Sequence, residues 1–416
     1  MYMGDLLTSV SSLQEAKTLY RQAKDLFAAG GFELRKWSSN SSLLLDSLEK
    51  GDVVISRVEF DSCSVLGLRW LPDGDLFDFR VELEPRSSTK RNILSTVARI
   101  FDPLGFLSPV TLYLKGLIKQ LWQEGADWDH PPSPEVTLKW KRVLAEFAQL
   151  TEVRIPRFLG IRENTRLNLY GFCDVSENGY GAVIYLKGEA DKPYVSFVCG
   201  KAKVAPTKVI SIPRLELCAA LLLSKLFLVV VETFTKRNLK PEIFAFSDST
   251  VVLCWLNSEP NRWNTFVANR VAKIQSNLRA EKWAHIKGAE NPADCLSRGL
   301  TPQELSNHPY WFHGPDWLLK NESQWPTTPL SFKEEDCHEQ KKKLALQTQV
   351  QPENIFIQFI QRFSSFQKLL NSMIYLLLFV QVLPKQILIT ASDCDKAELT
   401  LCKIIQSQIS HPKSNA

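Results

Sequence analysis

The sequence predicts an α/β protein of several domains, centred on a mixed five-stranded sheet flanked by helices. Three strand patterns (residues 167–174, 179–186 and 194–203) follow one another with short connections, which is typical of antiparallel hairpins. Helical patterns then alternate with strand patterns at residues 242–247 and 282–287. Such β-α-β alternation favours parallel strands with helices on the faces of the sheet.

The helices of this central region, taken as residues 156–300, follow from apolar spacing of 3.6 residues. A long helix is expected over residues 214–234, followed by helices over 249–257 and 264–280. A last helix begins at Pro292. Trp255 and Trp263 could stack on sugars or bases, but aromatic residues at helical positions more often belong to the core.

Residues 1–90 are expected to form a first unit. A helical pattern over residues 13–29 stops at two glycines. Strand patterns follow at residues 53–56 and 65–70, and a turn at Asp73 and Gly74 leads into a returning strand at 76–81.

Residues 91–155 read as a helical connection with helices near 112–123 and 134–152. A first helix there is broken at Asp102, because the residue before a proline is disfavoured in the α region.

The C-terminal third divides by composition. Residues 301–330 carry three tryptophans among proline and glycine and read as a packed irregular arm, residues 331–350 as a charged linker, and residues 351–416 as a helical tail. The most apolar run, residues 373–380, is shorter than the roughly 20 residues of a membrane span. The N-terminus lacks a signal pattern. We therefore expect an intracellular protein, cytoplasmic or nuclear, without a membrane partner.

The charge and the cysteines set weak limits on function. A net charge of +5 permits a nucleic-acid partner without demanding one. Nine scattered cysteines without a Cys-x-x-Cys pair argue against a zinc site or a disulfide framework.

Four acidic residues carry most of the functional information. Asp174 and Asp248 each end a predicted strand, and Glu216 and Asp294 are each expected in the first turn of a helix. Four carboxylates at one edge of a sheet would repel one another unless divalent cations lay between them. Hard oxygen ligands suit Mg²⁺ or Mn²⁺. Two such ions about 4 Å apart can activate water and stabilise a leaving oxygen in phosphodiester cleavage.

The order of these acids on strand, helix, strand and helix resembles a ribonuclease H domain. The segment FCDVS (172–176), followed by GYGA (179–182), looks like the first hairpin of a retroelement RNase H, and NPADCLSRG (291–299) looks like its final motif. Upstream, FDPLGFLSP (101–109) is similar to the Pol polyprotein of BEL/Pao retrotransposons. The resemblance covers roughly residues 1–325.

The resemblance implies an endonuclease that cuts the RNA strand of an RNA–DNA hybrid with two Mg²⁺ or Mn²⁺ ions. Asp174, Glu216, Asp248 and Asp294 would be both the catalytic residues and the metal ligands. Residues 91–155 would be the Pao-type connection, and other Pol or Gag chains are candidate partners.

The N-terminal segment YMGD (2–5) looks like the Tyr-x-Asp-Asp hairpin of a reverse transcriptase, with Gly4 in place of the first Asp. Residues 1–90 would then be the C-terminal remnant of a palm and thumb without polymerase activity, because polymerases need that carboxylate for their metals. Residues 351–416 would be the bridge before a missing integrase.

Several polar residues near the acids are candidates for substrate binding, each with a structural alternative. Ser176 and Ser249 could bind a phosphate or cap a turn. Asn291 could bind substrate or act as a helix N-cap. Arg298 could hold a phosphate or form a salt bridge. His285 is expected to be structural, because Ala289 fills the place of the family's product-release histidine.

A basic edge of Lys201, Lys203 and Lys208 could contact a hybrid's backbone, although we expect a solvated surface.

Two other functions stay open. A decayed element could persist as a silent module that binds nucleic acid or protein. An aspartic peptidase of the Pao (A17) type is a minor alternative. Such an enzyme usually carries its catalytic aspartates in Asp-Thr-Gly or Asp-Ser-Gly triplets. Neither triplet occurs in this sequence, and Thr250 stands where Asp248-Ser249 would need glycine.

Overall fold

The computed structural model describes residues 6–48, 63–65, 68–79, 87–162, 165–189, 193–329, 339–341, 355–384 and 388–409. The chain divides into two compact units, Met1–Lys341 and Lys342–Ala416, and each is described by itself.

A six-stranded mixed sheet forms the centre of the first unit, in the order β10-β9-β8-β5-β6-β7. The neighbours β5, β6 and β7 are antiparallel, whereas β8 runs parallel to β5 and β9 runs parallel to β8. The predicted mixed sheet is confirmed, and β10 is an additional strand that pairs with β9. The strands are β5 (Arg166–Val175), β6 (Gly179–Glu189), β7 (Tyr194–Val204), β8 (Glu242–Ser247), β9 (Trp283–Ile286) and β10 (Thr327–Thr328).

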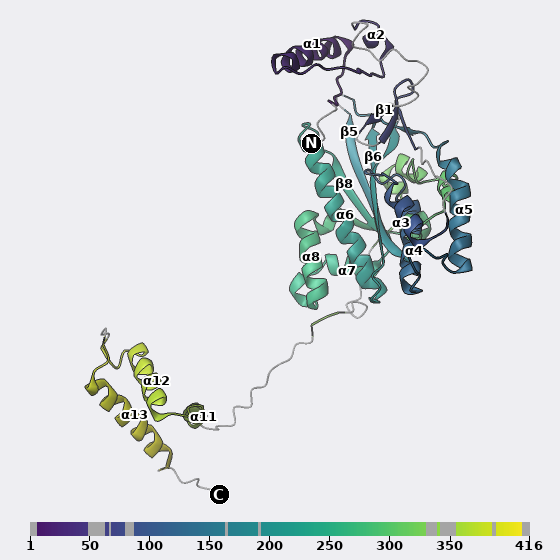
Figure 1. Cartoon of the computed structure of the whole chain (residues 1–416). Helices are drawn as coiled ribbons and strands as arrows, with labels where there is room; N and C mark the ends of the chain where they lie inside the picture. Colours follow the sequence, from purple (N-terminus) through teal and green to yellow (C-terminus); the bar gives the residue numbers. More distant parts are fainter. Residues whose placement is uncertain are drawn as a thin grey trace. The chain divides into compact units, whose positions relative to one another are not determined.

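Helices cover both faces of this sheet (Figure 1). Because side chains alternate along a strand, Leu169 and Cys173 of β5 pack on one side, and Tyr170 and Phe172 pack on the other. The first side belongs to a core with α6 (Ile212–Thr235), α7 (Thr250–Leu256) and α8 (Thr265–Asn277), and the second to a core with α3 (Lys90–Ala98), α4 (Ser108–Gln123) and α5 (Pro134–Leu150).

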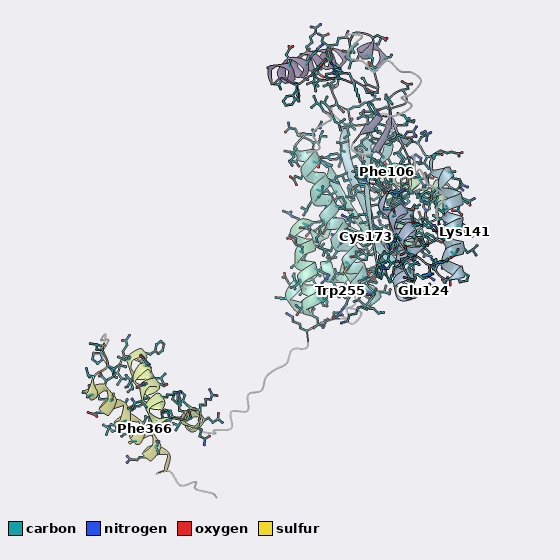
Figure 2. The ribbon with its side chains drawn as sticks, in the orientation of Figure 1. Phe106, Glu124, Lys141, Cys173, Trp255 and Phe366 are labelled. Carbon is teal, nitrogen blue, oxygen red and sulfur yellow. The ribbon has the colours of Figure 1, made fainter. Side chains whose placement is uncertain are left out.

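The helices of residues 91–155 therefore share a core with the sheet. Phe106 marks this core in Figure 2, whereas Cys173 and Trp255 mark the core on the opposite face. The side chain of Phe106 packs on Phe197 of β7, with ring centroids 4.9 Å apart.

A tight loop before α4 docks on β7. The backbone N–H of Gly200 donates to Leu104 O at 2.9 Å, and the Asp102 carboxylate accepts from the N–H groups of Gly105 and Leu107 at 3.0 and 2.8 Å. Gly105 has φ +83°, and a Cβ there would lie 1.8 Å from Gly200 O. Only glycine fits this loop.

The tryptophan-rich arm packs onto the same face of the sheet. It contains α10 (Pro302–Ser306) and a short 3₁₀ segment, Asp316–Leu319. The buried Trp317 ring lies 5.8 Å from Phe172 and 5.5 Å from Phe246 between centroids.

The N-terminal part forms a small antiparallel sheet of β1 (Cys63–Val65), β2 (Leu68–Leu71), β3 (Leu76–Asp78) and β4 (Ile155–Pro156). The helix α1 (Leu13–Ala29) and the hairpin around Gly74 occur as predicted. A short helix, α2 (Ser42–Leu45), lies between them in sequence. The segment of residues 2–5 and the strand expected at 53–56 lie outside the described residues.

The second unit is helical, as expected for the tail. It consists of α11 (Ile355–Gln361), α12 (Phe366–Phe379) and α13 (Ala391–Ile409). Leu370, Ile374 and Leu377 of α12 form its core with Ala397 and Leu401 of α13.

Among the described helices, α6 alone is long and apolar enough to cross a membrane by length and composition. The apolar pattern over residues 214–234 predicts this helix, but residues 373–380 were named as the most apolar run. Half of its apolar window is buried, and Leu223 and Phe227 pack on the sheet. It is the core helix of this fold.

Candidate active site

Two of the four predicted acids lie at the same edge of the sheet. Asp174 is the penultimate residue of β5, and Asp248 follows β8 directly. Because β5 and β8 are parallel neighbours, their carboxyl ends meet at one edge. The Cys173 thiol donates to Phe246 O at 3.6 Å and ties the two strand ends together.

Asp294 approaches Asp174 from a short helix, α9 (Asp294–Arg298), and lies in its first turn, as predicted. The helix lies close to β6 because Gly181, the partner of Asp174 across the ladder, has no side chain. A Cβ at Gly181 would lie 2.5 Å from the Cβ of Leu296. This glycine therefore allows Asp294 to reach the strand end.

Asn291 fastens the loop before α9 to β5. Its Nδ2 donates to Cys173 O at 3.0 Å, and its Oδ1 accepts from the N–H of Ala293 at 3.1 Å. The N-cap of α9 is Ala293, so the expected helix-cap role of Asn291 is wrong. The sequence pattern placed the helix start two residues too early, and the buried Asn291 amide joins two elements instead.

Glu216 lies in the second turn of α6, where a first-turn position was expected. The helix begins at Ile212 rather than Arg214, because Pro213 is well suited to the first turn and does not end the preceding loop. The Ser249 hydroxyl donates to Glu216 Oε2 at 2.6 Å, and its oxygen also accepts from the N–H of Val252 as the N-cap of α7. This bond brings Glu216 to the loop that carries Asp248.

The acids influence one another's charge. Burial, followed by the charge of Asp248, raises the pKa of Asp174 to about 7, and Asp294 adds to the rise. Burial also raises the pKa of Asp248, although a hydrogen bond with Asp174 partly offsets this. The pKa of Glu216 rises through burial and through the charge of Asp248. The four carboxylates thus form one electrostatic cluster.

Among the described residues, no three Asp, Glu, His or Cys side chains stand in an arrangement that would already hold a metal ion. The chemistry of the donors fits a hard divalent cation all the same. All four are carboxylates, and Asp174 lacks a basic side chain among the main influences on its pKa. Burial and, to a lesser extent, mutual repulsion raise the pKa values of Asp174, Asp248 and Glu216, and a bound cation would favour their ionised forms.

Ser297 is a contact of the site that the sequence reasoning did not single out. Its hydroxyl is fully buried and donates to Asp174 Oδ2 at 2.5 Å, with Asp294 O as a second acceptor at 3.0 Å. Ser297 follows Asp294 by three residues, and this spacing places both on one side of a helical turn. That spacing was a usable signal.

Three of the four residues expected to bind substrate are engaged inside the fold. Ser176 Oγ donates to Ser297 O at 2.5 Å and accepts from the N–H of Asn178, which is the turn role. Ser249 and Asn291 make the bonds described above. Arg298 is different, because its side chain is 69% exposed and its Nε donates to Asp294 Oδ1 at 2.7 Å.

The histidine, the two tryptophans and the lysines considered above lie outside the group of four acids. His285 lies in β9, as predicted, with Nε2 3.2 Å from Asp248 O, and the exposed Ala289 lies in the 3₁₀ segment Gly288–Glu290 that follows. Trp255 and Trp263 are buried in the core, as expected. The three lysines of the basic edge are exposed: Lys201, Lys203 and Lys208.

A family model matches part of this chain. Residues 89–249 match the family model described as the Pao retrotransposon-like RNaseH-like domain. This stretch contains Asp174, Glu216 and Asp248. With the strand order of the sheet, the match identifies a Pao-type, RNase H-like region.

Two further comparisons were made, with curated proteins and with solved structures. A search of curated proteins finds no match. Among solved structures, the chain is similar to RNase H1 from the halophilic archaeon Halobacterium salinarum NRC-1, with 16% identity and a TM-score of 0.21. That similarity covers 32% of this chain and 94% of the other.

Proposed function

We propose that this protein is an RNase H-type endonuclease that cuts the RNA strand of an RNA–DNA hybrid with two Mg²⁺ or Mn²⁺ ions. The observation that carries the proposal is the position of Asp174 and Asp248 at the ends of two parallel neighbouring strands, where burial, followed by the charges of Asp248 and Asp294, raises the pKa of Asp174. Such perturbed groups concentrate at functional sites.

Asp174 and Asp248 would share the two ions, and Glu216 and Asp294 would complete the two ligand sets. When bound, the ions would supply an activated water and neutralise charge on the leaving oxygen. The protein's own contribution is to hold the carboxylates in place. Ser297 orients Asp174, Ser249 orients Glu216, and Arg298 pairs with Asp294.

The resemblance to RNase H domains favours a hybrid substrate, and 2′-hydroxyls would let the protein distinguish the RNA strand from DNA. Exposed basic residues on β7 and the loop after it, including Lys201 and Lys208, would add attraction to the phosphate backbone that is independent of sequence. Other retroelement Pol or Gag chains remain proposed partners. The assignment of residues 1–90 to a reverse transcriptase remnant also remains a proposal.

The test is cleavage of a hybrid labelled on its RNA strand by the purified full chain, with Mg²⁺, Mn²⁺ or EDTA. We expect cleavage that needs the metal and is lost in Asp174→Asn. Glu232→Gln is a matched control, because it removes one negative charge from an exposed pair with Lys236 at the far end of α6. Cleavage that survives Asp174→Asn would refute the proposal. Tight hybrid binding without cleavage by the folded wild type would identify a silent binding module.

A further inference from the structure

A short segment of the charged stretch packs against the chain that precedes α8, within the first unit. We call residues 339–341 the strap. Glu339 O accepts from the N–H of Asn264 at 2.8 Å, and the N–H of Lys341 donates to Arg262 O at 2.9 Å. Between them, Gln340 pairs with Trp263 in an antiparallel bridge. The strap thus lies along the chain that leads into α8.

The side chain of Glu339 fills an anion site. Its Oε1 accepts from Arg214 Nε at 2.6 Å, and its Oε2 accepts from Asn264 Nδ2 at 2.9 Å. The Glu339 side chain is 17% exposed, so this pair is better shielded from water than an ordinary surface pair. Asn264 is also the N-cap of α8, where the helix dipole favours a negative charge.

The surroundings add positive charge. Phe266 lies between two guanidinium groups, with its ring centroid 5.0 Å from Cζ of Arg214 and 3.5 Å from Cζ of Arg270. Arg214 precedes Glu216 by two residues on α6, so this site begins on the helix that carries one of the four acids. A guanidinium, an amide and a helix N-terminus suit a phosphate at least as well as a carboxylate.

The strap is held under strain. Glu339 has φ +75°, a left-handed conformation that is unfavourable for any residue except glycine. Two backbone hydrogen bonds, which together form the bridge, the ion pair with Arg214 and the bond from Asn264 Nδ2 oppose that cost. A group that offers the same contacts without the strain can replace the Glu339 carboxylate.

We propose that the strap is an autoinhibitory element, in which Glu339 occupies the position of a backbone phosphate of the nucleic acid and must leave before the substrate seats fully. The inference rests on the proposed function for its ligand, a nucleic-acid phosphate. It adds that the chain regulates access to its own site.

The test measures binding without cleavage, by fluorescence anisotropy of a labelled RNA–DNA hybrid with the full chain in EDTA. Glu339→Gln keeps the shape of the side chain but weakens its hold on Arg214. We expect hybrid affinity to rise by about three- to ten-fold, the equivalent of losing one partly shielded ion pair. The control Glu232→Gln removes the same charge and is expected to change the affinity by less than about two-fold.

A second pair of variants distinguishes competition for Arg214 from a general effect of negative charge on binding. In an Arg214→Met background, Glu339→Gln should no longer raise the affinity. Equal effects of Glu339→Gln and Glu232→Gln would overturn the proposal, as would a loss of thermal stability in Glu339→Gln with no gain in affinity. Absence of hybrid binding by every variant would also overturn it. Failure of the proposed nuclease is seen separately, as absence of cleavage with Mg²⁺ by a chain that binds.

Discussion

Ser297→Ala probes how the protein controls the charge of Asp174. The Ser297 hydroxyl has one hydrogen and two nearby acceptors, Asp174 Oδ2 and Asp294 O. When Asp174 is ionised, the hydrogen points to its carboxylate. When Asp174 is protonated, the carboxyl donates to Ser297, and the hydroxyl turns to the Asp294 carbonyl. The bond to the ionised form lowers the pKa of Asp174. Its removal should raise that pKa.

The rise in the pKa of Asp174 follows from the strength of its hydrogen bond with Ser297. A buried hydrogen bond to a charged group contributes about 1.5–3 kcal/mol, which corresponds to about one to two pKa units. With a pKa of about 7, Asp174 is about half ionised at pH 7 without metal. A rise of one unit leaves about a tenth ionised. Because the metal needs the ionised form, the Mg²⁺ concentration for half-maximal cleavage at pH 7 should rise about five-fold.

The assay is the rate of hybrid cleavage against pH at several Mg²⁺ concentrations. The ascending limb of the Ser297→Ala profile should move up by about one pH unit, and saturating Mg²⁺ should restore most of the rate. Ser224→Ala is the matched control, because Ser224 is also buried and bonded to Leu221 O but lies within α6 away from the acids. If the two variants lose stability equally and their pH profiles overlay the wild type, the reasoning about Asp174 is refuted.

Three further predictions concern the fold. Gly105→Ala should destabilise the first unit by about 3 kcal/mol or more, seen in urea denaturation, because its Cβ would overlap Gly200 O; an unchanged midpoint would contradict the docking of the loop. Trp317→Ala should lower the free energy of unfolding by about 3–5 kcal/mol in the same measurement, because the Trp317 ring packs on Phe246. An unchanged free energy of unfolding would contradict this packing of the arm. Burial raises the pKa of Asp102 to about 6, so the folded state binds more protons than the unfolded state between pH 4 and 6. Stability should therefore fall as pH rises through that window. Asp102→Asn should make this fall less steep, and the remaining slope would come from Asp174, whose pKa is also raised; equal slopes for both proteins would contradict the prediction.

The parts of the site that the sequence predicted depend on local chain direction. Asp174 and Asp248 each follow a mostly apolar strand pattern, and two parallel strands present their carboxyl ends at the same edge, so local patterns were sufficient to bring them together. Asp294 was identified differently, from the motif of residues 291–299 that resembles the final motif of a retroelement RNase H.

The remaining features depend on contacts between distant segments. Glu339 lies in a stretch expected to be a solvated linker, yet its carboxylate bonds Arg214, which lies 125 positions earlier in the chain. The bond from Ser297 to Asp174 spans 123 positions. Neither has a local signature, because hydrophobic periodicity reports which face of an element is buried and not which polar groups meet there.

The most direct test of the central claim is cleavage of an RNA–DNA hybrid by the purified full chain, compared with Asp248→Asn, in Mg²⁺ and in EDTA. The account predicts cutting of the RNA strand by the wild type in Mg²⁺, no cutting in EDTA, and at least a hundred-fold loss, on the order of a removed catalytic group, in Asp248→Asn. A folded wild-type protein that leaves the hybrid intact in Mg²⁺, or an Asp248→Asn variant that cuts it as fast as the wild type, would contradict the account.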